Sequence, residues 1–179
     1  FDAPDDATET AFARLAVALA KYWSNKRCAP VIAEAMECLG GMGFIEETPM
    51  PWLYREAPLN AIWEGAGNVI CLDVLRTLEK HPQALEALRA ELHLAMGSNA
   101  HYDAAMRATL SRYGKGVEER DARHFVETMA LLLQANLLLR YADPAVGEAF
   151  AATRLGGDWG RTSGTLPAGI DARRLADMI

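Results

Sequence analysis

The stretch IWEGAGN, Ile62 to Asn68, is followed directly by VICLDVLRTLEK over residues 69–80. The glycines mark the beginning of a helix, and the apolar residues after them recur three and four positions apart, the spacing of one helical face. These apolar residues are Ile70, Val74, Leu75 and Leu78. The segment therefore predicts an amphipathic helix that the chain enters through a glycine-rich turn.

Helical spacing continues toward the N-terminus, where Phe12, Leu15, Leu19 and Trp23 share one face of a helix. Asp6 followed by Glu9 resembles a capping box at its start. We expect Pro30 to interrupt this helix and to open a second one, which ends at the Gly40-Gly41 pair.

The residues between the two glycine-containing segments, 42–60, are predicted to be irregular. Pro49, Pro51 and Pro58 fall within them, and proline removes a backbone donor from a helix.

After residue 80 the pattern predicts further helices. One begins at Pro82 and ends near Gly97, and another has Ser98 as its N-cap and ends at Gly114. The longest is expected from about Val117 to Tyr141, and the last from Pro144 to near Gly156. The apolar side of the longest helix carries Phe125, Met129, Leu132, Asn136 and Leu139. The glycine-rich tail after Gly157, with Gly160, Gly164 and Gly169, is predicted to be extended or loosely held.

Strand signals are nearly absent, so we expect an all-α fold, an up-and-down helical bundle with additional C-terminal helices. A soft boundary near His81 and Pro82 divides the chain into residues 1–80, which carry the chemical motifs, and residues 81–179, which carry the additional helices and the tail. The chain opens at Phe1 rather than Met, so we expect an N-terminal part to be missing from it.

Composition limits the function. The 179 residues are 51% hydrophobic, contain no apolar run long enough to span a bilayer, and carry a net charge of −6, which argues against a protein that mainly holds phosphate backbones. The histidines form no metal-binding spacing, so we expect no metal site. Cys28, Cys38 and Cys71 lack CxxC spacing and are interpreted as reduced, buried thiols of a cytoplasmic protein.

Glu64 is the candidate for chemistry. It lies between Trp63 and Gly65 at the predicted mouth of a helix, and a carboxylate shielded by an indole is suited to act as a general base. Gly65, Ala66 and Gly67 would let a planar ligand approach the backbone, and Asn68, four residues after Glu64, would share its helical face. The alternative is structural: Glu64 serves the helix dipole and the glycines only mark a bend.

A dinucleotide-binding turn is excluded for this segment. Ile70 stands where the third glycine of that motif belongs, and no strand precedes the turn.

LGGMGF (39–44), YREAP (54–58) and IWEGAGN (62–68) together resemble the signature of the acyl-CoA dehydrogenase family in order and in spacing. ICLDVLR, HFVETMALLLQ and GTLPAGID resemble the AidB-like branch of that family, which takes part in the response to DNA alkylation. The resemblance covers nearly the whole chain and is most specific from about Pro30 to Leu78.

The resemblance implies a flavin-dependent dehydrogenation in which Glu64 removes the α-proton of an acyl-CoA thioester and the β-hydride goes to FAD. Gly40 and Gly41 match the stretch that contacts the adenosine end of FAD, often that of a neighbouring subunit. Four further residues match the flavin-contacting turn or flank the base there: Trp63, Gly65, Ala66 and Asn68. Arg55 matches a structural arginine, for which we expect an internal ion pair.

The sequence departs from the family at two positions. Ala66 stands where the family usually has Thr, and Glu37 where it has Gln. Ala66 removes a hydroxyl from the flavin contact, and Glu37 places a carboxylate near cofactor phosphates. The family's other two domains, which supply most flavin and CoA contacts, are outside this chain, so we expect the chain alone to be inactive.

Two alternatives remain open. One is a duplex-DNA-binding module that uses Arg107, Arg112, Arg120, Arg123 and Arg140, although Glu118, Glu119, Asp121 and Glu127 offset these charges. Within this group, Arg123 and Glu127 have the spacing of an intrahelical pair. The other is an oligomerisation bundle, because the family assembles as homo-oligomers, dimers or tetramers, through this helical domain.

Overall fold

The computed structural model describes residues 6–157 and 163–178, and every regular element in those ranges is helical. The predicted all-α fold is confirmed. The elements are α1 (Ala7–Cys38), α2 (Gly41–Phe44), α3 (Met50–Asn60), α4 (Gly67–Lys80), α5 (Pro82–His93), α6 (Ala100–Tyr113), the 3-10 turn η1 (Glu119–Asp121), α7 (Ala122–Tyr141), α8 (Pro144–Arg154) and α9 (Ala172–Ala176).

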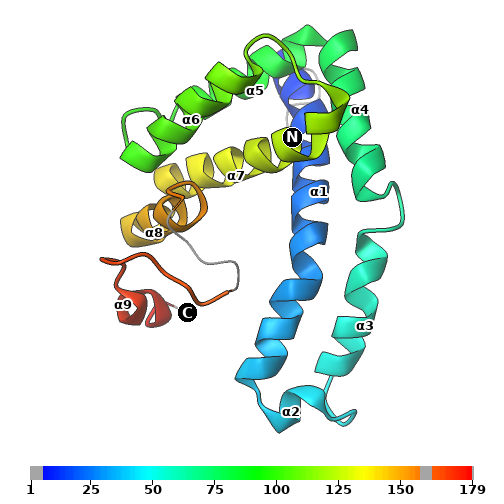
Figure 1. The fold of residues 1–179 in the computed structure, drawn as a ribbon, viewed down its shortest axis with the longest axis vertical. Helices are drawn as coiled ribbons and strands as arrows, with labels where there is room; N and C mark the ends of the chain where they lie inside the picture. Colours follow the sequence, from blue (N-terminus) through cyan, green and yellow to red (C-terminus); the bar gives the residue numbers. More distant parts are fainter. Residues whose placement is uncertain (1–5, 158–162, 179) are drawn as a thin grey trace.

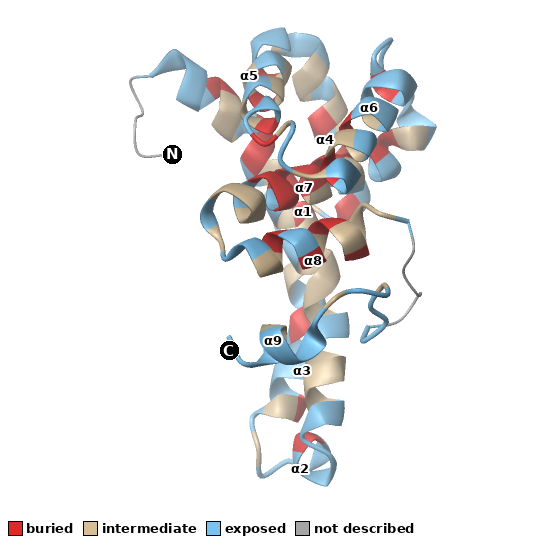
Figure 2. Cartoon of the chain, turned by 90° about the vertical axis from the view of Figure 1, so that its left-hand side faces the viewer, coloured by how far each residue is buried: buried red, intermediate tan, exposed pale blue. Residues whose placement is uncertain are grey.

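Helix α1 forms the long axis of the molecule, and α3 and α4 follow one another back along it (Figure 1). Helices α5 to α8 gather beside the N-terminal half of α1, where α7 contacts α1, α4, α5, α6 and α8. Buried residues concentrate in this upper part, whereas the lower end around α2 is largely exposed (Figure 2). The core continues across residue 80, since α1 packs against α5 and α7 as well as α3 and α4. The division at that residue stays a prediction.

Helix α1 begins where the capping pattern predicts. The Asp6 carboxylate accepts from the amides of Thr8, at 2.7 Å, and Glu9, at 3.1 Å. The predicted interruption at Pro30 is wrong, because α1 continues through it to Cys38. Pro30 is exposed, so the hydrogen bond that it removes lies on the solvent side, where a helix tolerates the loss best.

The prediction of an irregular segment at residues 42–60 is also wrong. Pro49 is the N-cap of α3 and Pro51 lies in the first turn, where no helical donor is needed. Pro58 lies in the last turn and removes a single hydrogen bond near the end of the helix. The three prolines therefore mark the ends of a short helix instead of preventing one.

The C-terminal helices differ from the prediction mainly at their ends. The N-cap of α6 is Asn99, whose side chain accepts from the amides of His101 and Tyr102, while the Ser98 hydroxyl donates to the Ala95 carbonyl. The longest helix is α1, and α7 begins only at Ala122, after η1. The tail is not wholly extended, since it forms α9. Gly160 lies outside the described residues. Of the predicted α7 face, Phe125, Met129, Leu132 and Asn136 are buried and Leu139 is half-buried.

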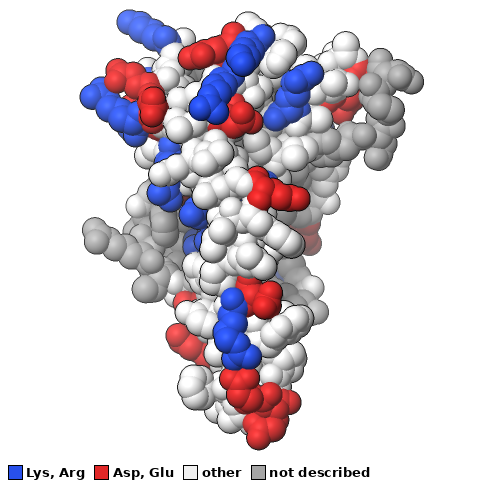
Figure 3. Space-filling model, turned by 90° about the vertical axis from the view of Figure 1, so that its right-hand side faces the viewer, with Lys and Arg blue, Asp and Glu red and all other residues white. Residues whose placement is uncertain are grey.

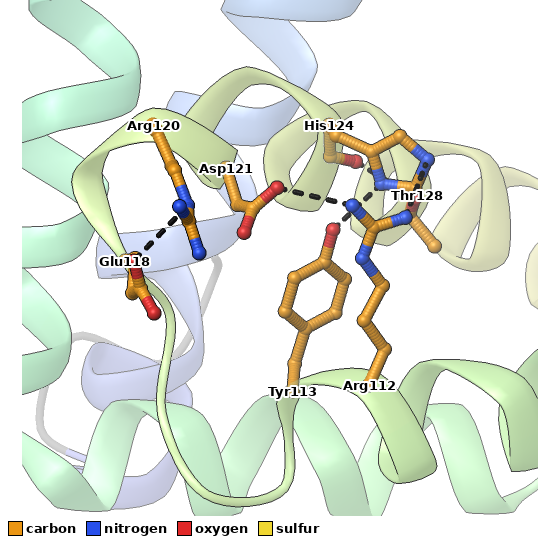
Figure 4. A network of polar contacts seen from close by, with 7 residues as sticks. All are labelled: Arg112, Tyr113, Glu118, Arg120, Asp121, His124 and Thr128. Atoms are coloured by element: carbon orange, nitrogen blue, oxygen red, sulfur yellow. Dashed lines mark hydrogen bonds and ion pairs between the residues drawn. The ribbon is translucent and has the colours of Figure 1, made fainter.

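A polar network joins α6 to the start of α7 (Figure 4). Arg112 donates to the Asp121 carboxylate at 3.0 Å, and its other nitrogen lies 3.4 Å from Nε2 of His124. Arginine can only donate, so Nε2 must accept, and Nδ1 then carries the proton toward the Tyr113 hydroxyl at 2.6 Å. The Thr128 hydroxyl completes the group and donates to the His124 carbonyl at 2.7 Å. The network fixes the angle at which the chain re-enters the core after α6.

Tyr102 forms a buried hydrogen bond that connects α6 to α5. Its ring is fully buried and its hydroxyl donates to the carbonyl of Leu92 at 2.6 Å. Burial raises the pKa of Tyr102 above its ordinary value, so the hydroxyl stays a donor under physiological conditions.

Tyr102→Phe should lower the free energy of unfolding by about 1–2 kcal/mol, because it leaves the buried Leu92 carbonyl without its donor. Urea denaturation measures the change. Tyr54→Phe, at an exposed position on α3, is the matched control and should be neutral. Equal effects of the two variants would show that the buried bond contributes nothing.

Among the residues described, no helix combines the length and the apolar character needed to cross a bilayer.

Candidate functional site

The connection between α3 and α4 is a sharp turn with unusual backbone geometry. Glu64 has φ +52°, the one positive value at a non-glycine residue in the described part of the chain, and Gly65 follows with φ +105°. A residue with a Cβ in this left-handed region costs about 1–2 kcal/mol. Such strain persists only where the surroundings impose it, and it concentrates at functional sites.

Lys21, on α1, imposes the turn. Its ammonium donates to the carbonyls of Trp63 and Glu64, both at 2.7 Å, and lies 3.4 Å from that of Gly65. One helical turn later on α1, the Asn25 amide donates to the carbonyl of Asn60 at 2.6 Å. Two side chains of α1 thus fasten the end of α3 and the turn after it.

The Glu64 side chain is left available by this arrangement. Lys21 takes the backbone carbonyl of Glu64, and no group in residues 6–157 or 163–178 hydrogen-bonds to or pairs with the carboxylate. The side chain is exposed, as are its neighbours Ile62 and Trp63. The shielding that the sequence predicts beside Trp63 would therefore need a further surface to cover this turn.

Two details of the predicted turn are wrong. Helix α4 begins at Gly67 with Ala66 as its N-cap, so Glu64 lies before the helix and does not share a helical face with Asn68. Gly67 is buried, and a Cβ there would come within 2.6 Å of Cε of Lys26. The backbone of Gly67 is therefore covered by Lys26 and Tyr22 of α1 and is not open to a ligand.

The start of α4 nevertheless presents free donors. Ala66 offers no side-chain acceptor to the amides of the first turn, and both Ala66 and Asn68 are exposed. Unpaired amides at a helix N-terminus attract an anion or a carbonyl oxygen. Trp63, Glu64, Gly65, Ala66 and Asn68 thus occupy one short stretch of accessible backbone.

Gly40 and Gly41 lie elsewhere. They begin α2, at the opposite end of α3 from Glu64 (Figure 1), and a helix of 11 residues spans about 16 Å. A Cβ at either glycine would meet no atom within 4 Å, so the backbone there is open to a ligand. The exposed Glu37 lies just before Gly40, whose amide donates to its carbonyl. The structure therefore gives two separate sites of bare backbone, and both fit the approach of an extended cofactor.

Arg55 forms the ion pair that the sequence predicts, but the pair is exposed and not internal. Its guanidinium donates twice to the carboxylate of Glu46, at 2.8 and 3.1 Å, and thereby holds the pKa of Glu46 below its ordinary value. The pair links the α2–α3 connection to α3 and does not reach the Glu64 turn.

A band of exposed apolar side chains surrounds these residues. Phe44 is 77% exposed, and Trp52 and Trp63 are also exposed. Figure 3 shows that uncharged residues cover much of the middle of one face, interrupted by a few acidic side chains, while Lys and Arg gather mainly toward its upper end. Exposed apolar side chains in this number are typical of a surface that binds a partner or a ligand. The band comprises Leu39, Met42, Phe44, Ile45, Trp52, Leu53, Leu59, Ile62, Trp63 and Val69.

The cysteines differ from one another. Cys71 is buried, as predicted, and burial raises the pKa of its thiol, whereas Cys38 is exposed and Cys28 half-buried. Within the ranges described, no three His, Cys, Asp or Glu side chains gather closely enough to hold a metal ion.

The arginines considered for DNA are largely paired with other groups of the chain. Arg112 pairs with Asp121, Arg120 with Glu118, and Arg140 with Glu91. The predicted bond between Arg123 and Glu127 is not what the structure contains, since Arg123 donates to the hydroxyl of Tyr22 on α1 at 3.4 Å. Three of the five candidate arginines thus pair with a carboxylate of the described chain.

The roles of Lys21 and Asn25 could not be predicted from the sequence, because their hydrogen-bond partners lie 35 to 44 residues away along the chain. The signal available was weak: two polar side chains four apart on the face of α1 that packs against α3.

Lys21→Met should release the turn while keeping the aliphatic stem. We expect the free energy of unfolding to fall by about 1–2 kcal/mol, because charge-assisted bonds to three carbonyls are lost. Amide hydrogen exchange over residues 62–68 should accelerate, and this exchange is the deciding measurement. Lys80→Met, at the exposed end of α4, is the control, and unchanged exchange in Lys21→Met would mean that the lysine does not hold the turn.

Residues 2–79 match the family model for the acyl-CoA dehydrogenase C-terminal domain. The protein AidB of Escherichia coli K12 is 39% identical over 155 residues, covering 87% of this chain and 28% of AidB. Acyl-CoA dehydrogenase family member 11 of Caenorhabditis elegans is 35% identical over 95 residues, covering 53% of this chain and 15% of that protein.

The fold has solved counterparts. The crystal structure of C. elegans ACDH-11 in complex with C11-CoA superimposes with a TM-score of 0.66 at 26% identity, covering 82% of this chain and 28% of that one. The apo form of Bd2924 gives a TM-score of 0.59 at 30% identity, covering 76% and 26% respectively. The chain thus spans about a quarter of the length of these solved structures and of AidB.

Proposed function

Since the chain belongs to the acyl-CoA dehydrogenase family, with residues 2–79 as its C-terminal domain, we propose that it supplies the base for a flavin-dependent α,β-dehydrogenation of an acyl-CoA thioester. One observation carries the proposal: the Glu64 carboxylate has no partner in the described chain and stands on a strained turn that Lys21 fastens. A structural acid would be expected to pair with a nearby cation or amide, and Glu64 does neither.

Glu64 acts on the α-carbon. Its carboxylate takes the α-proton, and the electron pair of that C–H bond forms the new double bond as the β-hydride leaves. FAD, when bound, supplies the acceptor for that hydride. Lys21 holds the turn, so the carboxylate need not be reorganised during the reaction.

The other residues of the turn position the reactants. Trp63 gives an apolar wall that keeps water from the carboxylate once a second surface closes over it. Gly65 and Ala66 allow a flat ring system to lie against the backbone, and Asn68 offers an amide to it. At the other end of α3, Gly40 and Gly41 leave room for the adenosine end of a cofactor, in keeping with a second copy's FAD.

The substrate class has support from a relative. ACDH-11, which shares the fold at 26% identity, was solved in complex with C11-CoA. We therefore propose an acyl-CoA as the substrate. A cytoplasmic location stays a prediction.

The test uses a chimera in which this chain replaces the matched segment of E. coli AidB. Anaerobic addition of acyl-CoA should bleach the visible absorbance of the oxidised flavin. An intact, flavin-loaded chimera that is not reduced by any acyl-CoA would overturn the proposal.

Assembly is a second function that the apolar band favours. We propose that the band docks on a second copy of the chain, giving a dimer or tetramer. Phe44→Glu should lower the oligomer mass of the chimera in light scattering, whereas Leu137→Glu, on the far helix α7, should not. The pairing of three candidate arginines with carboxylates gives a duplex-DNA role no support.

A further inference from the structure

A cavity of about 360 Å³ opens among helices α4, α5, α6 and α7, and none of its lining residues belongs to the Glu64 turn. Its size falls within the range of small-molecule sites, about 300–1,000 Å³. Four helices and the loop after α6 form its walls, so it penetrates between elements and is not a groove along one face. Its apolar lining includes Leu75, Leu78, Leu85, Met106, Leu110 and Phe125.

The inner part of the cavity is lined by residues of the hydrophobic core. Leu92, Met106, Phe125, Met129 and Leu132 are buried, yet they leave space that closer packing would have filled. The apolar lining makes fewer dispersion contacts here than it would against a neighbouring side chain. A ligand with a matching apolar body would recover those contacts.

The polar groups of the cavity are few, and most already have partners. The Thr109 hydroxyl donates to the Ala105 carbonyl, and the Tyr113 hydroxyl faces His124. Arg89 is the one cation in the lining, and Glu86 contacts a single nitrogen of its guanidinium, at 3.2 Å. Four N–H donors of Arg89 remain for a ligand. Glu79, which is exposed at the end of α4, also borders the cavity, so an anion would bind on the Arg89 side.

We propose that this cavity binds a single-chain amphiphile with one anionic head, the chemistry of a medium-chain fatty acid. Arg89 holds the head, and the chain lies against the leucines and methionines. At about 30 Å³ for each non-hydrogen atom, the cavity holds about a dozen such atoms, which is the size of decanoate. The proposal is independent of the dehydrogenation, because it uses no residue of that site.

Isothermal titration of the 179-residue chain with decanoate tests the proposal. We expect one saturable site with Kd of about 10–100 µM, which about a dozen buried atoms can support. Decanol should bind at the same site, and hexadecanoate should bind less well because it exceeds the cavity. The absence of saturable decanoate binding would overturn the proposal.

Two matched variants locate the site. Leu110 lines the cavity and Leu137 lies outside it on α7, and both are 43% exposed, so each tolerates a larger side chain equally. Leu110→Trp should weaken decanoate binding at least tenfold, while Leu137→Trp leaves it unchanged. Equal weakening of decanoate binding by the two variants would place the ligand elsewhere. Unchanged binding in Leu110→Trp with the melting temperature preserved would do the same.

Charge variants identify the head-group contact. Arg89→Gln should weaken decanoate about tenfold and leave decanol unchanged, and Glu79→Gln should strengthen decanoate alone. If Arg89→Gln affects the two ligands equally, the assignment of the head group to Arg89 is wrong. Both positions are polar and not buried, so neither exchange disturbs the core.

Discussion

Glu64→Gln should slow the reduction of bound flavin by acyl-CoA about 10²- to 10⁴-fold, the contribution of a positioned general base. The amide keeps the shape of the side chain but cannot take the α-proton. Lys21 contacts the backbone carbonyl of residue 64, which the exchange leaves in place, so the turn should keep its conformation. Single-turnover flavin bleaching in the AidB chimera measures the rate.

The control for this result is Glu56→Gln. Glu56 is an exposed carboxylate on α3 that lies outside the Glu64 turn, so its rate should equal that of the parent. Binding of acyl-CoA should be nearly unchanged in Glu64→Gln, because the loss falls on the chemical step. A Glu64→Gln enzyme that reduces flavin as fast as Glu56→Gln would remove Glu64 from the mechanism and favour its structural interpretation.

Glu91→Ala should lower the free energy of unfolding by about 1–3 kcal/mol, the largest stability effect that we expect from removing a polar group. The Glu91 carboxylate on α5 accepts from both Arg140 and Asn136 on α7. Asn136 is fully buried and its own Oδ1 already lacks a partner, while Arg140 and Glu91 are 23% and 25% exposed. Removing Glu91 takes the acceptor from the buried Asn136 amide. It also removes the carboxylate from Arg140, which is partly buried and keeps its contact with the Tyr141 hydroxyl.

Urea denaturation against Glu86→Ala isolates this effect. Glu86 lies on the exposed side of the same helix and pairs only at the surface, so its removal should cost less than about 1 kcal/mol. The double variant Glu91→Leu with Arg140→Met should regain part of the loss, because it removes both charges together. Similar losses for Glu91→Ala and Glu86→Ala would mean that the α5–α7 tie is not a buried one.

The sequence predicted the start of α1 well, because apolar spacing and the Asp6 cap agree there. It also predicted most of α4 and α7, where apolar spacing alone indicates a helix. The prediction was wrong where a proline was expected to end a helix or to prevent one. Pro30 and Pro58 each cost a single hydrogen bond, and the packing of α1 against α3 outweighs that local cost. Whether packing outweighs a lost hydrogen bond depends on the helix that packs against the proline-containing one. A local sequence pattern does not identify that helix.

The candidate site was predictable as a list of residues but not as a geometry. The glycines indicated a turn at residues 62–68, yet the left-handed conformation of Glu64 and its fastening by Lys21 depend on contacts across more than 40 residues. The same limit applies to Gly67, whose role is set by Lys26 and Tyr22 on a distant helix. From the sequence alone, Gly65, Ala66 and Gly67 appear equally open to a ligand.

The most direct test of Glu64 follows proton removal by itself. An acyl-CoA analogue with sulfur in place of the β-carbon has no hydride to give, so exchange of its α-hydrogen with D₂O reports the base alone. In the flavin-loaded chimera, NMR should show rapid α-deuterium incorporation for the parent and for Glu56→Gln, and none above the uncatalysed rate for Glu64→Gln. Equal incorporation in Glu64→Gln and the parent would contradict the account.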